Sequence, residues 1–130
     1  MIKIEHIALY VQDLERMRSF YETYFGLTSG TKYHNKKTLF SSYFLRSEME
    51  GARIELMHRP DVKRLAVDRS EPFGFTHCAF ALGSKYAVDT LTERLRADGW
   101  VVLSEARTTG DGYYESVIED PEGNRIELTV

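Results

Sequence analysis

An internal repeat constrains the fold of this chain more than any other feature of its sequence. The segment IEHIALYV is followed by a helical pattern that ends at Gly26 and then by ARIELM. About 71 residues later, FTHCAFAL, a second helical pattern ending at Gly99, and NRIELTV follow in the same order. The tetrapeptide RIEL occurs at 53–56 and again at 125–128. Because such a repeat is one supersecondary unit used twice, we expect two equivalent modules.

Each copy has the pattern of one strand, one helix and three further strands. Apolar residues at helical spacing predict the two helices, and Asp13 and Ser84 are suitable N-caps for them. The predicted modules span residues 1–58 and 75–130, and the polar segment 59–74 is the predicted linker. The predicted strands are 3–11, 27–34, 38–47 and 51–58 in the first copy, and 76–82, 100–107, 113–119 and 124–130 in the second.

This order of elements predicts an α+β fold within a single domain of 130 residues. We expect the two tandem βαβββ modules to form a curled, mostly antiparallel eight-stranded sheet. The helices are expected to cover its outer face, so that the other face is free to line a cavity.

The balance of charged and apolar residues limits the partners of the chain. It is 42% apolar and 28% charged, with a net charge of −3 and both signs interspersed, so we expect no nucleic-acid or membrane partner. No apolar run approaches the roughly 20 residues of a transmembrane helix, and the segment MIKIEHIALYV lacks the pattern of a signal peptide. Because Cys78 is the only cysteine, no intrachain disulfide can form, and a cytoplasmic location is expected.

The repeat places a histidine and a glutamate at matching positions of each copy. His6 precedes Glu55 by 49 residues, and His77 precedes Glu127 by 50 residues. Since successive side chains of a strand point to opposite faces, all four are expected on the face away from the helices, beside small residues such as Ala8. Two imidazoles and two carboxylates that converge in a cavity predict a site for a divalent metal ion.

Each of these residues has an ordinary interpretation when it is taken alone. A single histidine on a strand is usually not a ligand, and a single glutamate away from the core is usually solvated. The matched set of four favours the metal site over these interpretations. The other histidines, His34 and His58, are expected at the surface, and Cys78 is expected to be a small buried residue rather than a nucleophile.

Four more residues are candidates for contact with a small-molecule substrate. Alternation along the strands places Tyr10 and Met57 on the predicted cavity face. Arg53 and Arg125 stand two residues before the two glutamates. They are placed either to steer an anionic substrate or to lie solvated at the rim of the cavity.

These features resemble the glyoxalase I / vicinal oxygen chelate superfamily. This superfamily also includes bleomycin-resistance proteins, extradiol dioxygenases, methylmalonyl-CoA epimerase and fosfomycin-resistance enzymes. The resemblance covers essentially the whole chain and is carried by HIALYVQDLERMRSFYETYFGL, GFTHCAFAL and EDPEGNRIEL. The order His, Glu, His, Glu is similar to that of bacterial glyoxalase I. Epimerases have Gln at the position of Glu55, and dioxygenases and fosfomycin-resistance enzymes leave that position without a ligand.

The resemblance implies a metal-dependent lyase or isomerase that is similar to lactoylglutathione lyase and transfers a proton on an adduct of an α-oxoaldehyde and a thiol. It implies Glu127 as the catalytic base and Glu55 as its counterpart on the other side of the metal. It also implies one divalent ion per site, Ni, Zn, Co or Mn, and a homodimer in which modules of two subunits often pair. The implied metal ligands are His6, Glu55, His77 and Glu127.

The resemblance leaves the substrate and the reaction class open. Relatives that use glutathione hold it with an arginine and an asparagine where this chain has Tyr10 and Arg59, so another thiol or another substrate is an alternative. A small-molecule or antibiotic-binding resistance protein of the same fold is a second alternative. An oxidoreductase similar to the extradiol dioxygenases is a third.

Overall fold

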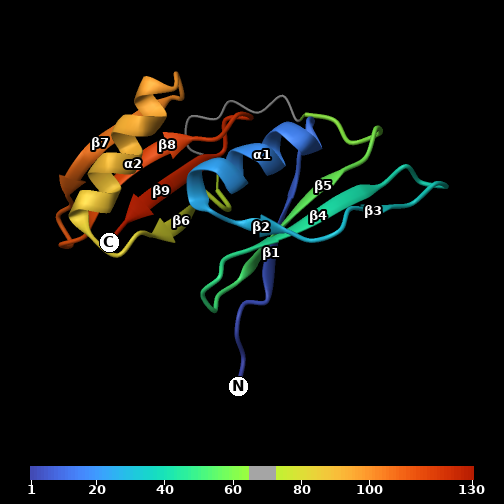
Figure 1. Cartoon of the computed structure of the whole chain (residues 1–130), viewed down its shortest axis with the longest axis horizontal. Helices are drawn as coiled ribbons and strands as arrows, with labels where there is room; N and C mark the ends of the chain where they lie inside the picture. Colours follow the sequence, from blue (N-terminus) through green and yellow to red (C-terminus); the bar gives the residue numbers. More distant parts are fainter. Residues whose placement is uncertain (65–72) are drawn as a thin grey trace. The chain divides into compact units, whose positions relative to one another are not determined.

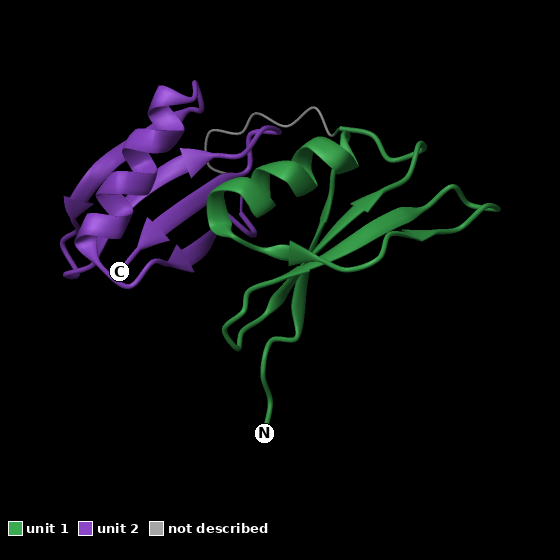
Figure 2. Cartoon of the chain, in the orientation of Figure 1, with its two compact units in different colours: residues 1–65 green, residues 66–130 purple. Residues whose placement is uncertain are grey.

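The computed structural model describes residues 1–64 and 73–130 of the chain (Figure 1). The chain divides into two compact units, unit 1 (Met1–Leu65) and unit 2 (Ala66–Val130), shown in Figure 2. Part of the predicted linker, residues 65–72, lies outside the described residues. Among the described residues, neither helix has the length and apolar character needed to cross a membrane.

Unit 1 is a five-stranded mixed sheet with one helix. The elements in chain order are β1 (His6–Tyr10), α1 (Leu14–Phe25), β2 (Thr28–Ser29), β3 (Tyr33–His34), β4 (Ser41–Arg46) and β5 (Arg53–His58). The strand order is β1-β5-β4-β2, and β3 also pairs with β4. Only the β1·β5 pair is parallel, and α1 packs on one face of the sheet against β2, β4 and β5.

Unit 2 repeats this arrangement with four strands. The elements are β6 (His77–Ala81), α2 (Lys85–Ala97), β7 (Val102–Thr108), β8 (Tyr114–Glu119) and β9 (Arg125–Thr129). The strand order is β6-β9-β8-β7, with a parallel β6·β9 pair and antiparallel pairs elsewhere. Helix α2 packs against β7, β8 and β9, so each sheet carries its helix on one face (Figure 1).

The predicted α+β class and the two βαβββ modules are confirmed, and five of the seven strand pairs within the described residues are antiparallel. In detail, the strands form two sheets, of five and four strands, instead of one sheet of eight. The ninth strand arises because the predicted strand 27–34 is split into β2 and β3. Thr28 stands opposite Arg46 but Tyr33 stands opposite Ser42, so the register against β4 shifts by one residue between them, as at a bulge.

Both helices begin at the predicted N-caps. The Asp13 carboxylate accepts a hydrogen bond from the Arg16 N–H at 2.9 Å, and the Ser84 hydroxyl oxygen accepts one from the Ala87 N–H at 3.1 Å. Helix α1 ends at Gly26, whose φ of 62° lies in the left-handed region that favours glycine.

Along the last strand of each unit, β5 and β9, buried side chains alternate with half-buried ones. The four apolar side chains that face the helices are at most 7% exposed: Ile54 and Leu56 on β5, and Ile126 and Leu128 on β9. Glu55 and Glu127 lie between them in sequence and are half-buried on the opposite face. The predicted alternation therefore holds at the strands that carry both glutamates.

Helix α2 also buries a polar pair that the sequence analysis did not predict. The Thr92 hydroxyl donates to the Val88 carbonyl at 2.6 Å, and Thr92 Oγ1 and Ser116 Oγ lie 2.7 Å apart. Both residues are at most 1% exposed. The hydrogen bond between their hydroxyls makes this burial tolerable, because buried polar groups are costly when they have no partner.

Candidate metal centre

The first His–Glu pair lies on neighbouring parallel strands of unit 1. His6 on β1 stands opposite Arg53 on β5, which places Glu55 opposite Ala8. Residues paired in register point to the same face of a sheet, so His6 and Glu55 share a face, and the small Ala8 side chain opposite Glu55 leaves room between them. The His6 Nε2 atom is 3.6 Å from the Glu55 Oε2 atom.

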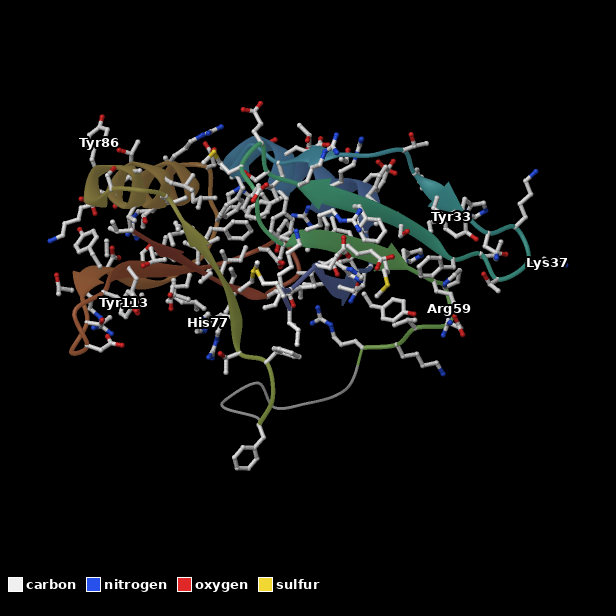
Figure 3. The ribbon with its side chains drawn as sticks, turned by 90° about the horizontal axis from the view of Figure 1, so that it is seen from below. Tyr33, Lys37, Arg59, His77, Tyr86 and Tyr113 are labelled. Carbon is white, nitrogen blue, oxygen red and sulfur yellow. The ribbon has the colours of Figure 1, made fainter. Side chains whose placement is uncertain are left out.

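Unit 2 holds the second pair in the same register. His77, at the start of β6 (Figure 3), stands opposite Arg125, and Glu127 stands opposite Ala79. The His77 Nε2 atom is 3.4 Å from the Glu127 Oε2 atom. The matching intervals in the sequence therefore correspond to matching positions in the two sheets.

Both separations suit two ligands of one metal ion. They exceed the roughly 2.7–3.2 Å of a direct N–H···O hydrogen bond. Two donor atoms that each lie about 2.0–2.2 Å from one ion are about 3–4 Å apart. Imidazole nitrogen and carboxylate oxygen together are donors that Zn, Ni, Co and Mn accept. Within residues 1–64 and 73–130, no group of three or more His, Cys, Asp or Glu side chains is assembled for a metal, so the predicted four ligands are found as two pairs.

The second ring nitrogen of each histidine also has a partner. In unit 1, His6 Nδ1 contacts the Glu5 carboxylate, whose other oxygen contacts the Arg53 guanidinium. These contacts lower the pKa of Glu5, with the hydrogen bond to His6 as the main cause. In unit 2, Thr76 Oγ1 lies 3.0 Å from His77 Nδ1.

Sequence reasoning missed Glu5 and Thr76 for the same reason. Strict alternation places the residue before each histidine on the opposite face of the sheet. Both residues instead precede the first residue of their strand, where the regular alternation does not yet apply. The available signal was their matching position in the two copies.

The side chains that flank the two His–Glu pairs differ. In unit 1, Phe44 stands opposite Glu55, and its ring meets the His6 ring edge to face at 5.4 Å and 83°. In unit 2, Val117 stands opposite Glu127.

A second carboxyl, that of Glu115, lies beside the glutamate of unit 2. Burial and the neighbouring Glu127 carboxylate raise the pKa of Glu115. Glu115 was not among the predicted site residues, although alternation along the predicted strand 113–119 places it on the same face as Val117. Of the two adjacent tyrosines that precede it, Tyr114 donates a hydrogen bond to Asp89 on α2 and so points to the helix side.

The predicted substrate contacts lie on the strands that carry the pairs. Met57 is half-buried and stands opposite Tyr10, whose side chain is exposed. The centroid of the Tyr10 ring lies 6.0 Å from the Arg59 guanidinium carbon. The Arg59 side chain donates to the Asp61 carboxylate at 2.5 Å. Arg125 is half-buried. Contact of these residues with a substrate stays a prediction.

The other two histidines and the cysteine make contacts that fit a structural role. His34 is exposed and its Nδ1 lies 2.8 Å from the Ser41 hydroxyl. His58 was expected at the surface; it is half-buried, and its Nδ1 donates to the Val11 carbonyl at 2.8 Å. Cys78 is half-buried, and burial raises the pKa of its thiol, which suits a buried small residue better than a nucleophile.

Three comparisons relate this chain to known proteins. The profile of the Glyoxalase/Bleomycin resistance protein/Dioxygenase superfamily matches residues 3–128. The "Uncharacterized protein YqjT" of Bacillus subtilis is 34% identical, covering 96% of this chain and 96% of its own length. The "Probable lactoylglutathione lyase" of Vibrio cholerae is 28% identical, covering 97% of this chain and 88% of its own length. The crystal structure of lactoylglutathione lyase from Agrobacterium tumefaciens has a TM-score of 0.69 at 25% identity, covering 97% of this chain and 91% of that one.

Proposed function

Because this chain belongs to the Glyoxalase/Bleomycin resistance protein/Dioxygenase superfamily, we propose that it is a metal-dependent lyase or isomerase of the glyoxalase I type. The proposed substrate is an adduct of an α-oxoaldehyde and a thiol. The observation that carries this proposal is the His–Glu pair that each unit holds in the same register, at 3.6 Å and 3.4 Å. The names of the relatives from Vibrio cholerae and Agrobacterium tumefaciens support the same class of reaction.

The two pairs together are proposed to hold one divalent ion, Ni, Zn, Co or Mn. Two imidazoles and two carboxylates suit these metals, and Glu55 adds a ligand beyond a set of two histidines and one carboxylate. When bound, the ion supplies Lewis-acid polarisation of two adjacent oxygens of the substrate. The proposed ligands are His6, Glu55, His77 and Glu127.

Glu127 is proposed as the base that removes the proton beside the substrate carbonyl and returns it to the neighbouring carbon. It is half-buried on β9, within 3.4 Å of the His77 ring, so its carboxylate is held on the face that carries the ligands. Glu55 is its proposed counterpart in unit 1. General base catalysis of this kind typically contributes about 10²–10⁴-fold to the rate.

The proposed substrate contacts are Tyr10, Arg53, Met57 and Arg125. The thiol is the open part of the proposal, because Tyr10 and Arg59 occupy positions where a glutathione-binding arginine and asparagine would be expected. Arg59 is also engaged by Asp61. Thiols other than glutathione therefore have to be tested beside it.

The test is metal analysis of the purified protein combined with an activity screen. Methylglyoxal is supplied with several thiols to protein reconstituted with Ni, Co, Zn or Mn. We expect turnover with Ni or Co and none after chelator treatment. Tight ligand binding that chelator does not disturb, without turnover, would instead support a binding protein. Oxygen consumption with a catechol and Fe(II) would support a dioxygenase.

A second experiment decides whether the two pairs combine within one chain or across the proposed homodimer. His6→Ala and His77→Ala each remove one ligand, and each variant alone should be inactive. If the site forms between subunits, co-expression restores about a quarter of the wild-type activity, because half of the dimers are mixed and each mixed dimer has one complete site. If it forms within one chain, co-expression restores no activity.

A further inference from the structure

The residue before His6 belongs to a closed network of contacts in unit 1. One Glu5 carboxylate oxygen contacts His6 Nδ1 and the other contacts the Arg53 guanidinium. The Glu5 main-chain carbonyl also accepts from the Arg53 N–H at 2.9 Å, which extends the β1·β5 pairing by one residue. Glu5 is therefore tied to β5 through both its main chain and its side chain.

Arg53, which holds the Glu5 carboxylate, is itself held. Its guanidinium carbon lies 4.2 Å from the centroid of the Phe44 ring, within the range of a cation–π contact. Phe44 in turn packs against the His6 ring. Each member of the network thus contacts two others, and the carboxylate is kept behind the imidazole although Glu5 is exposed.

We propose that Glu5 is a positioning residue for His6. Its carboxylate accepts the Nδ1–H of the imidazole and so selects the tautomer in which Nε2 carries a free lone pair toward Glu55, 3.6 Å away. A nitrogen lone pair and a carboxylate at this distance can coordinate the same cation. A carboxylate that accepts from the other ring nitrogen also makes the imidazole a stronger electron-pair donor to the metal. This inference rests on the proposed metal site.

Unit 2 provides the internal contrast. His77 Nδ1 lies 3.0 Å from the Thr76 hydroxyl, which is neutral. A hydroxyl either donates or accepts, so it selects no tautomer of the ring, whereas a carboxylate can only accept. Of the two histidines, His6 is therefore the one whose tautomer is set by a neighbouring carboxylate.

The first test measures Ni²⁺ affinity of the full-length chain by competition with a chelator. Glu5→Ala should weaken binding about 10–100-fold, the usual effect of removing such a partner. Glu5→Gln keeps an acceptor and should recover part of the loss, and Thr76→Val should have a smaller effect than Glu5→Ala. Glu48→Ala removes the same charge from an exposed position between β4 and β5 and serves as the matched control. Equal affinities of Glu5→Ala and Glu48→Ala would overturn the inference.

The second test needs no metal. Nitrogen NMR of labelled, metal-free protein, at a pH where the rings are neutral, reports the tautomer of His6. We expect the Nδ1–H form in the wild type and a mixture in Glu5→Ala; the same tautomer population in both would also overturn the inference. If the wild type binds no metal, the proposed function fails while this measurement still decides the role of Glu5.

Discussion

Units 1 and 2 hold a histidine and a glutamate in the same register but surround them with different side chains. In unit 1 the Phe44 ring packs against His6 and the Arg53 guanidinium, whereas in unit 2 the smaller Val117 takes the place of Phe44 and the acidic Glu115 lies beside Glu127. An arginine in register with the histidine is common to both units. The parallel pairing of the strands sets the spacing of the histidine and the glutamate in each unit. The side chains that flank each pair are not fixed by this strand pairing, so they can differ between the two units.

The cores beneath the two sheets differ in the same way. Helix α1 buries Phe20 and Tyr21, whose rings lie 5.4 Å apart, and β4 adds the buried Tyr43. Helix α2 buries Thr92 against Ser116. Both sets of buried side chains support the same order of strands and helix, because the pattern of buried positions matters more to a fold than the identity of the buried side chains.

The largest predicted difference between the units is catalytic. Glu127→Gln should lower kcat by about 10²–10⁴-fold, because the proposed base is lost, while the metal content is largely kept. Glu55→Gln should lower kcat less, since Glu55 is proposed as the counterpart of the base and not as the base itself. Steady-state kinetics together with metal analysis of both variants provides the check. Equal losses would show that the two glutamates are interchangeable, and full activity of Glu127→Gln would contradict the assignment of the base.

The next prediction concerns what the units share. Leu56 and Leu128 occupy equivalent positions beneath the helices and are both fully buried. Leu56→Ala and Leu128→Ala should each lower the free energy of unfolding by about 2–5 kcal/mol, through lost burial and the cavity left behind. Urea unfolding followed by fluorescence measures the change.

Leu103→Ala on β7 is the control for these two variants. The Leu103 side chain is 45% exposed, so its removal should change the free energy of unfolding by less than about 1 kcal/mol. A large loss from only one of the two buried leucines would contradict the equivalence of the two cores.

The features that follow from local chemistry and from the repeat were predictable. Asp13 and Ser84 start their helices because a side-chain oxygen satisfies a free N–H of the first turn. The His–Glu pairs followed from the matching intervals together with strand alternation. In both cases the prediction needed only residues close in sequence or the comparison of one copy with the other.

What could not be predicted depends on exact strand ends and on side-chain partners across strands. Glu5 lies one residue before β1, where the alternation of the regular strand does not fix the direction of the side chain. The break between β2 and β3 reflects a one-residue shift against β4, which no local pattern marks. Thr92 and Ser116 are 24 residues apart, and only the packing of α2 on β8 brings their hydroxyls together.

The buried hydroxyl pair of unit 2 gives a smaller expected effect. Thr92→Val removes one partner and leaves the fully buried Ser116 hydroxyl without it, so the free energy of unfolding should fall by about 1–3 kcal/mol. In unit 1, Tyr43→Phe removes a hydrogen bond of 3.0 Å to Glu15. Since half of the Glu15 side chain is exposed and water can replace this bond, the loss should be about 0.5–1.5 kcal/mol.

Thr90→Val is the matched control for this comparison, since Thr90 lies on the same helix and is exposed. Urea unfolding should show almost no change for it beyond the small difference in helix propensity. If Thr92→Val were as mild as Thr90→Val, the buried pair would contribute nothing specific to the core of unit 2.

The smallest predicted effect separates the two helix caps. Asp13→Ala and Ser84→Ala should each cost about 1 kcal/mol, because each leaves a first-turn N–H without its acceptor. Asp13 is also charged, and a negative charge near a helix N-terminus adds about 0.3–1 kcal/mol at low ionic strength. The loss at Asp13 should therefore exceed that at Ser84 in dilute buffer, as measured by urea unfolding.

High salt screens the charge of Asp13, so it separates the electrostatic contribution to the difference in stability between Asp13→Ala and Ser84→Ala. Raising the ionic strength to about 1 M shortens the Debye length to about 3 Å, so the excess loss of Asp13→Ala should shrink while that of Ser84→Ala stays the same. Asp13→Asn keeps an oxygen for the Arg16 N–H and removes only the charge, so it should show the salt-dependent part alone. An excess that persists at high salt would show that the charge of Asp13 is not its cause.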